Sequence, residues 1–203
     1  PVMRLIEEGK VREDLWELLM LNCRTPDLLD GDLLAMLGST QIGGERVVGL
    51  ATELGLDAYL SYLDGVLNHA DRRMRSAVLA LPDGTYFGED HTDNDCFKKI
   101  DIAVRVKMII DGDAMSIDFS GTDPQIEGFK NSSIANTYSS VYLAISSFFD
   151  PSIPRNEGTY RCVSINAPEG SIVNALPPAP MTMNTVYVAH EIVIAIWQAL
   201  ASA

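Results

Sequence analysis

The sequence is poor in cysteine and in basic residues. Its three cysteines, Cys23, Cys96 and Cys162, lie far apart and form no CxxC pair. This argues against a disulfide framework or a thiolate zinc site and favours a reducing cytoplasm. Only 15 basic residues oppose 28 acidic ones, so the formal net charge is −13. Such a chain repels the phosphates of nucleic acids and of anionic lipids, so we expect neither as a partner.

Long apolar runs are also missing, because Asp, Arg, Glu or Gly interrupts each run well before the length of a membrane span. No basic leader with a small-residue cleavage site is present. We therefore expect a cytoplasmic protein without a membrane segment. A hydrophobic content of 47% is nevertheless sufficient for a buried core. The start at Pro1 instead of Met, and a final apolar stretch without a Gly or Asn cap, predict a segment of a larger protein.

Helical periodicity dominates the first part of the chain, residues 1–81. Apolar residues recur at helical spacing from Val11 to Cys23 and again from Leu28 to Leu37, and Gly43-Gly44 then predicts a break or turn. The clearest helix runs from Leu56 to Leu81 and ends at a Pro-Asp-Gly turn. We predict a helical region over residues 1–81.

Strand periodicity begins in the second part, residues 82–203. Apolar residues alternate from Ile100 to Ile110 and from Met115 to Phe119, and the intervening Asp111-Gly112 is typical of a tight hairpin turn. Residues Thr85 to Asp93 predict a third strand. Further expected elements are a helix from Ala135 to Phe149, a strand from Tyr160 to Ala167, an extended linker at Pro177–Pro180 and a last helix over Val186–Leu200. The predicted class is α+β, with a helical region followed by an antiparallel hairpin-containing sheet and packed helices.

Four side chains form the best candidate metal site. In an extended segment Glu89, His91, Asp93 and Asp95 project from one face. Carboxylates suit Mg²⁺, Mn²⁺ or Ca²⁺, and the imidazole favours a transition metal. The alternative is a solvated acidic loop, since the later Gly and Glu of a calcium loop are absent.

Other motifs fail at a decisive position. The segment Gly38–Glu45 has the glycine spacing of a phosphate loop, but Gly44 stands where Lys is needed. His190-Glu191 begins like a metalloprotease helix, but Ile194 replaces the second His. We interpret His190 as a core or interface residue and His69 as a surface or interface residue. No GxSxG elbow supports serine-based acyl transfer. The chain therefore carries no complete catalytic site of its own.

Several runs, in this order and spacing, resemble the hydantoinase B/oxoprolinase family from near Val11 to the C-terminal end. They are Arg72–Arg75, Leu81–Tyr86, Gly88–Asp90, Asp118–Gln125, Asn156–Gly158, Pro168–Asn174 and Pro177–Pro180.

The resemblance implies part of the B-type subunit of an ATP-dependent cyclic amide hydrolase of the hydantoinase and 5-oxoprolinase type. In this family a kinase-like hydantoinase A subunit binds ATP with Mg²⁺ and phosphorylates the substrate oxygen, which implies a hetero-oligomer. The B part completes the reaction with a divalent metal such as Zn²⁺ or Mn²⁺, whose His and Asp ligands lie upstream of this segment. Two alternatives remain: a subunit of an ATP-dependent acetone or aryl ketone carboxylase, and a structural assembly segment without chemistry.

No family metal ligand can be carried over onto this sequence. Glu89, Asp90 and Asp93 match acidic family positions for which we expect a structural role, and His91 lies outside the family pattern. In the motif Asp118–Gln125 a turn-forming role is the first interpretation, since Gly121 permits the turn. As candidates for a substrate cavity we name Asp118, Thr122 and Asn131, because loops commonly line clefts.

Overall fold

The computed structural model describes residues 3–203. The chain divides into two compact units, residues 1–62 and 63–203, and the boundary falls within helix α3 (Leu56–Val78). No helix among the described residues is both long and apolar enough to cross a membrane.

The first unit is a small hairpin followed by helices. Its elements are β1 (Ile6–Glu7), β2 (Lys10–Val11), α1 (Glu13–Leu21), α2 (Pro26–Leu54) and the first turns of α3. Helix α1 contacts α2, and the Trp16 indole N–H donates to Asp30 Oδ1 at 2.8 Å. Gly55, with φ of +83°, separates α2 from α3 in a conformation that glycine adopts easily.

The expected break at Gly43-Gly44 is wrong, because α2 continues from Pro26 to Leu54. Glycine in a helix costs about 1 kcal/mol relative to alanine, yet it keeps its backbone hydrogen bonds, so good helix formers on both sides carry the helix through. No residue of α1 or α2 is buried, and large apolar side chains such as Leu28, Ile42 and Val48 are exposed.

The second unit contains a four-stranded sheet in the order β3-β4-β5-β6. The strands are β3 (Gly84–Asn94), β4 (Lys99–Asp111), β5 (Ala114–Asp118) and β6 (Val163–Asn166). The predicted hairpin is confirmed, since β4 and β5 pair antiparallel and Gly112 at the turn has φ of +57°. The predicted third strand is confirmed as β3, which pairs antiparallel with β4. Strand β6 runs parallel to β5.

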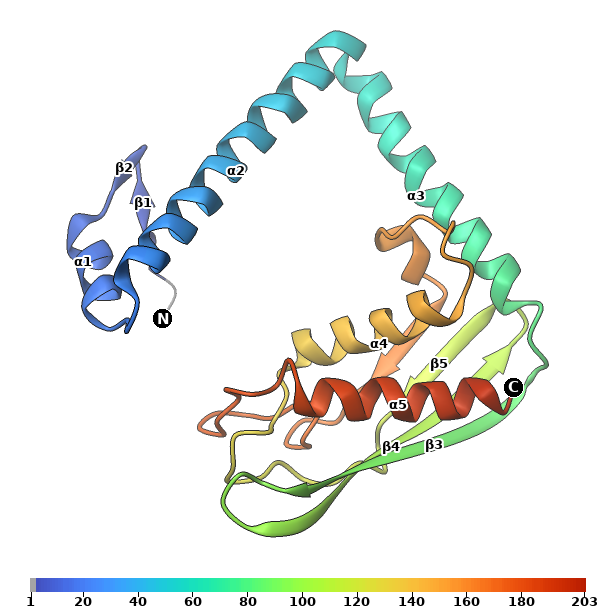
Figure 1. The fold of residues 1–203 in the computed structure, drawn as a ribbon. Helices are drawn as coiled ribbons and strands as arrows, with labels where there is room; N and C mark the ends of the chain where they lie inside the picture. The colour runs from blue at the N-terminus through green and yellow to red at the C-terminus, as the bar shows by residue number, and fades with distance from the viewer. Residues whose placement is uncertain (1–2) are drawn as a thin grey trace. The chain divides into compact units, whose positions relative to one another are not determined.

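Two helices cover one face of this sheet, namely α4 (Ile134–Phe148) and α5 (Tyr187–Ala201) (Figure 1). Helix α5 packs on β3 and β4, and α4 lies beside α5. Alternate residues of β4 face these helices, and the core consists mainly of aliphatic side chains, including Val104, Val106, Met108, Ile145, Ile192 and Ile196. Each such side chain contributes about 1.5–3 kcal/mol when fully buried. The α+β class is confirmed.

Other details also differ from the predictions. The strand expected from Tyr160 begins at Val163, because Glu157–Tyr160 forms a 3₁₀ turn capped by Asn156. Helix α3 ends at Val78. The proline run is a turn instead of an extended linker, since the Ala179 N–H donates to the Leu176 carbonyl at 3.1 Å.

Gly88 explains how closely α5 approaches β3. A Cβ atom at Gly88 would lie 1.9 Å from the carbonyl oxygen of Ala195 and 3.1 Å from the backbone nitrogen of Ala199. Only glycine therefore allows this packing. Because strand residues alternate, Asp90 and Thr92 share the helix-facing side with Gly88, and odd-numbered residues of β3 face away from α5.

Candidate functional site

The outer face of β3 and β4 carries most of the predicted metal-site residues. Glu89, His91 and Asp93 are exposed there, as the alternation predicted. Asp95 is separated from them by a register shift between Thr92 and Asn94. It is 3% exposed.

Asp95 caps the turn between β3 and β4. Its Oδ1 accepts the backbone N–H groups of Phe97 at 2.8 Å and of Lys98 at 2.6 Å. The pKa of Asp95 is lowered, first by the Lys98 N–H and then by that of Phe97, because both hydrogen bonds stabilise the charged carboxylate. Its role here is to hold the turn.

His91 lies between carboxylates. Its Nδ1 is 2.9 Å from Asp101 Oδ1, and its Nε2 is 3.8 Å from Glu89 Oε2. The hydrogen bond with Asp101 is the main cause of a raised His91 pKa, and the charges of Asp101 and Glu89 add to it. This arrangement favours the imidazolium, which does not coordinate metals.

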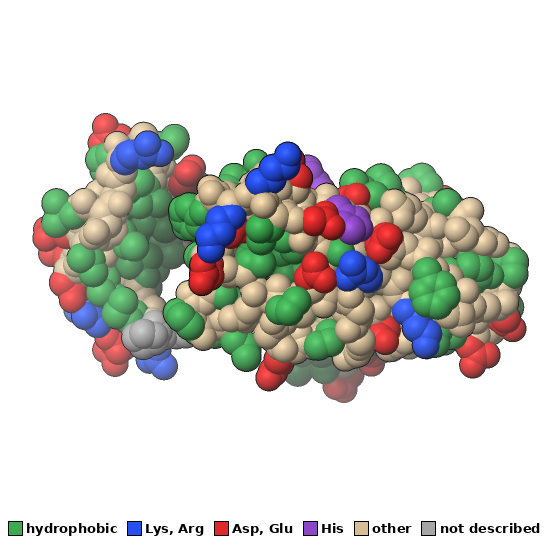
Figure 2. Space-filling model, turned by 90° about the horizontal axis from the view of Figure 1, so that it is seen from below, with side chains coloured by type: hydrophobic (Ala, Val, Ile, Leu, Met, Phe, Trp, Pro, Cys, Tyr) green, Lys and Arg blue, Asp and Glu red, His purple; other side chains and the backbone are tan. Residues whose placement is uncertain are grey.

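Arg105 on β4 pairs with two carboxylates at the same surface. Its Nε donates to Glu89 Oε2 at 3.2 Å. Its Nη1 donates to Asp123 Oδ1 at 2.9 Å and to the Gly121 carbonyl at 3.0 Å. The hydrogen bond with Asp123 is the main cause of a raised Arg105 pKa. Figure 2 shows acidic side chains gathered around a histidine and a basic side chain on this face.

The predicted metal ligands are therefore engaged with other partners. Within residues 3–203, no three His, Cys, Asp or Glu side chains lie together in the arrangement of a metal site. Glu89 bonds Arg105, His91 bonds Asp101, and Asp95 bonds backbone N–H groups. With these hydrogen bonds in place, the side chains are not arranged to coordinate a metal ion, and no metal chemistry is assigned to them.

Asp118 is the last residue of β5 and bonds Asn166, the last residue of the paired strand β6. Its Oδ1 accepts from the Ser120 hydroxyl at 2.6 Å, from the Ser120 backbone N–H at 3.0 Å and from the Asn166 amide at 2.8 Å. The Ser120 hydroxyl is the main cause of a lowered Asp118 pKa, and Asn166 adds to it. A carboxylate held in this way is a poor proton acceptor near neutral pH and a good fixed hydrogen-bond acceptor.

The Thr122 side chain bonds the backbone of β4 in the place of a neighbouring strand. Its Oγ1 accepts the Arg105 N–H and donates to the Arg105 carbonyl, both at 3.0 Å. Next to it, the Asp123 N–H donates to the Ala103 carbonyl at 3.1 Å, and Asp123 Oδ2 accepts the Ala103 N–H at 2.9 Å. The turn after β5 therefore continues the sheet where β5 itself has ended.

Asn131 is fully buried and holds a loop together. Its Oδ1 accepts the Ile126 N–H at 2.8 Å, and its amide group donates to the carbonyls of Ile126, Gly128 and Pro180. Each polar atom of this side chain already has a protein partner. The structure thus gives Asp118, Thr122 and Asn131 three separate local roles, and their contact with a substrate stays a prediction.

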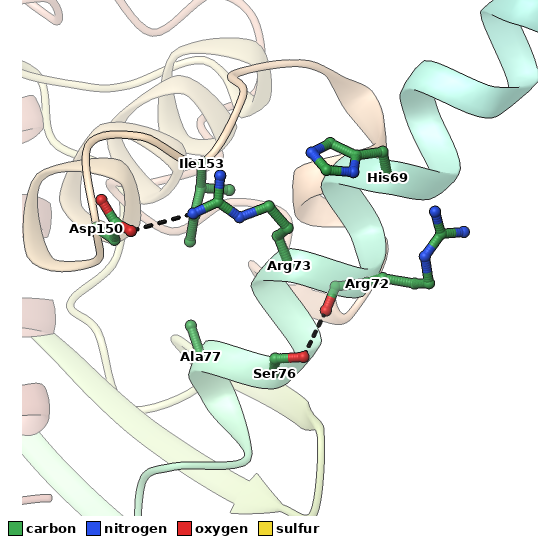
Figure 3. A pocket seen from close by; sticks show the side chains of 7 residues that line it. All are labelled: His69, Arg72, Arg73, Ser76, Ala77, Asp150 and Ile153. Carbon is green, nitrogen blue, oxygen red and sulfur yellow. Dashed lines mark hydrogen bonds and ion pairs between the residues drawn. The ribbon is translucent and has the colours of Figure 1, made fainter.

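A pocket of about 410 Å³ lies on the C-terminal half of α3 (Figure 3). Its lining includes His69, Arg73 and Asp150, and Ile153 forms an apolar part. Arg73 Nη2 lies 3.1 Å from Asp150 Oδ2, and its Nη1 donates to the Ser152 carbonyl at 3.0 Å. The pocket is the size of a small-molecule site.

Sequence reasoning missed this pocket. The spacing of His69 and Arg73, four residues apart on one helix, indicates a shared face. Asp150, however, lies 77 residues after Arg73. Nothing in the local pattern identifies that partner.

Comparison with known proteins places these features in a family. The family model of hydantoinase B/oxoprolinase matches residues 1–203. The caprolactamase subunit beta of Pseudomonas jessenii is 33% identical over 181 residues, which are 89% of this chain and 31% of that protein.

Two solved structures share the fold. The crystal structure of the ATP-dependent caprolactamase from Pseudomonas jessenii matches with a TM-score of 0.91 and 32% identity, over 100% of this chain and 35% of that one. A nucleotide-free acetone carboxylase matches with a TM-score of 0.85 at 17% identity, over 99% of this chain and 28% of that one, which shows the fold alone.

The chain thus spans about a third of the length of the caprolactamase relatives. The family match extends through both compact units, and the resemblance carried by the sequence motifs is confirmed. This chain belongs to the hydantoinase B/oxoprolinase family.

Proposed function

We propose that this chain is part of the B-type subunit of an ATP-dependent enzyme that hydrolyses a cyclic amide. The observation that carries the proposal is the match to the ATP-dependent caprolactamase over 100% of the chain at 32% identity. Caprolactam is a cyclic amide, as are hydantoins and 5-oxoproline. Since the chain covers 35% of that relative, it supplies a part of the subunit and is inactive by itself.

The chemistry of an amide explains why such an enzyme uses ATP. Phosphorylation of the amide oxygen converts a poor electrophile into one with a good leaving group, which water can then attack. In the proposed division of labour, a kinase-like hydantoinase A-type subunit in the same complex binds ATP and Mg²⁺. A divalent metal of the B-type subunit, such as Zn²⁺ or Mn²⁺, belongs to residues outside this segment. The complex works in the cytoplasm.

Within this scheme the residues of the chain provide a rigid framework. Arg105 connects β3 to the turn after β5 through Glu89 and Asp123, and Asn131 fixes the next loop. Pre-organised loops of this kind hold a reacting group in place without themselves exchanging protons. The pocket around Arg73, of about 410 Å³, is a concavity of this framework that could hold a small molecule.

Two other functions remain as alternatives. The first is a ketone carboxylase subunit, in which an enol phosphate would be carboxylated, and the fold shared with acetone carboxylase is compatible with it. The absence of buried residues in α1 and α2 favours an assembly segment that docks other parts of the enzyme. An assembly role is compatible with either enzyme.

The test is substrate-dependent ATP hydrolysis by the complete B-type subunit, assayed with and without its kinase-like partner. We expect ADP release only from the complex, and only when a hydantoin, 5-oxoproline or caprolactam is added. ADP release that instead requires acetone and bicarbonate would support the carboxylase. ATP turnover by the 203-residue chain alone would overturn the proposal.

A further inference from the structure

Helix α5 carries a single acidic residue, Glu191, on the side that packs against β3. Glu191 precedes Ala195 by four residues, so the two share a helix face, and Ala195 touches Gly88 of β3. The Glu191 side chain is 8% exposed. Its Oε2 is buried and accepts no hydrogen bond from any of residues 3–203.

Few charged groups surround this carboxyl. Strand β3 contributes Asp90, and the segment between β5 and α4 contributes Lys130. The same helix contributes Tyr187 and the exposed His190. Helix α4 contains no charged residue, and the helix-facing side of β4 is apolar. The acid therefore has one neighbouring carboxylate and one neighbouring ammonium group.

Lys130 is bound to β3 instead of to Glu191. It is 2% exposed, its Nζ donates to Thr92 Oγ1 at 2.7 Å, and it lies 4.2 Å from the centre of the Tyr187 ring. A buried ammonium with one neutral acceptor and one aromatic ring lacks a full counter-charge. Burial, with a smaller contribution from Asp90, raises the pKa of Glu191 to about 7.

We propose that this cluster is a proton-linked switch, in which loss of the Glu191 proton to water moves Lys130 from Thr92 to Glu191. A buried carboxylate without a partner is costly, whereas a buried carboxylate paired with an ammonium group is not. Lys130 already lies over the ring of Tyr187, and Glu191 follows Tyr187 by one helical turn on α5. The exchange therefore releases β3 from the segment before α4, while Lys130 stays on α5. The segment includes Asn131, so its loop responds to pH.

Hydrogen–deuterium exchange of the complete subunit at pH 6 and pH 8, corrected for intrinsic rates, tests the switch. The carboxylate fraction of Glu191 changes from about one tenth to nine tenths over this range. We expect the protection of residues 126–133 to change by about fivefold or more in the natural protein and to stay constant in Glu191→Gln. Equal pH dependence in both proteins would overturn the proposal.

The control removes an exposed acid, Glu169→Gln, and should keep the full pH response. If Glu191→Gln does not fold, Asp90→Asn provides the second test, because loss of the neighbouring charge must shift the transition to lower pH. A carbon-13 NMR titration of the side-chain carboxyls reads the midpoint directly. A change in the protection of residues 126–133 that does not follow this midpoint would contradict the switch.

Discussion

Arg105 Nη1 lies 2.9 Å from Asp123 Oδ1, and the contact joins β4 to a turn 18 residues later in the chain. Asp123 has a second task, because its Oδ2 accepts the N–H of the fully buried Ala103. One carboxylate therefore serves a cation and a buried backbone donor at the same time. The turn after β5 depends on both contacts for its position beside β4.

The first prediction concerns this carboxylate. Asp123→Ala leaves the Ala103 N–H without its side-chain acceptor and should lower the free energy of unfolding by about 2 kcal/mol. Urea denaturation followed by circular dichroism measures the change. The matched control is Glu127→Ala, which removes an exposed carboxylate that pairs only with Lys98 and should change stability by less than about 0.5 kcal/mol. Equal effects of the two substitutions would contradict the assigned role.

The second prediction compares two glycines. Gly88→Ala places a methyl group 1.9 Å from the Ala195 carbonyl oxygen, so α5 must move away from β3, at a cost of about 3 kcal/mol or more. Gly44→Ala lies in α2, where no described atom beyond the local helix backbone comes within 4 Å of the added Cβ, and should stabilise the helix by up to about 1 kcal/mol. Thermal unfolding of both variants provides the measurement. A neutral Gly88→Ala would show that α5 does not pack as described.

Local patterns predicted the second unit well because its elements bury one side. Strand β4 alternates apolar and polar side chains along its length, and α5 repeats apolar ones at helical spacing, so each pattern reports a single buried face. Helix α2 buries no residue, so the spacing of its apolar side chains did not mark a buried face from which its full length could be predicted. There the expected break at Gly43-Gly44 was wrong.

The candidate site was only partly predictable for a different reason. Alternation correctly placed Glu89 and His91 on one exposed face. It failed for Asp95, because the register shift after Thr92 changes which side a residue faces. The Arg105–Asp123 pair depends on a turn folding back beside β4, which is a tertiary fact that no local spacing encodes.

The third prediction concerns His91 and its partner Asp101. The raised pKa of His91 means that folding favours the imidazolium, so this contribution to stability is complete below the unfolded pKa near 6.5 and is lost as pH rises through the folded pKa. Asp101→Asn should lower the pKa of His91, since the hydrogen bond with Asp101 is its main cause. Proton NMR titration of the imidazole measures it. The matched control is Glu127→Gln, which removes an exposed carboxylate paired with Lys98 and should leave the pKa of His91 unchanged.

The fourth prediction is the effect of Glu191 on stability. Its folded pKa of about 7 exceeds the unfolded value near 4.5, so the folded state holds one more proton between these pH values. The contribution of Glu191 to stability is therefore complete below about pH 4.5 and falls as pH rises to about 7, by roughly 3 kcal/mol at about 1.4 kcal/mol per pKa unit. Glu191→Gln, which resembles the protonated acid, should remove this slope.

The measurement is the difference in free energy of unfolding between the two proteins at several pH values from 5 to 8. Other titrating groups cancel in this difference, because both proteins share them. We expect the natural protein to lose stability relative to Glu191→Gln as the pH increases, and the loss to level off above pH 7. Two parallel curves would mean that Glu191 is already ionised at pH 5, and its burial against β3 would then need another counter-charge.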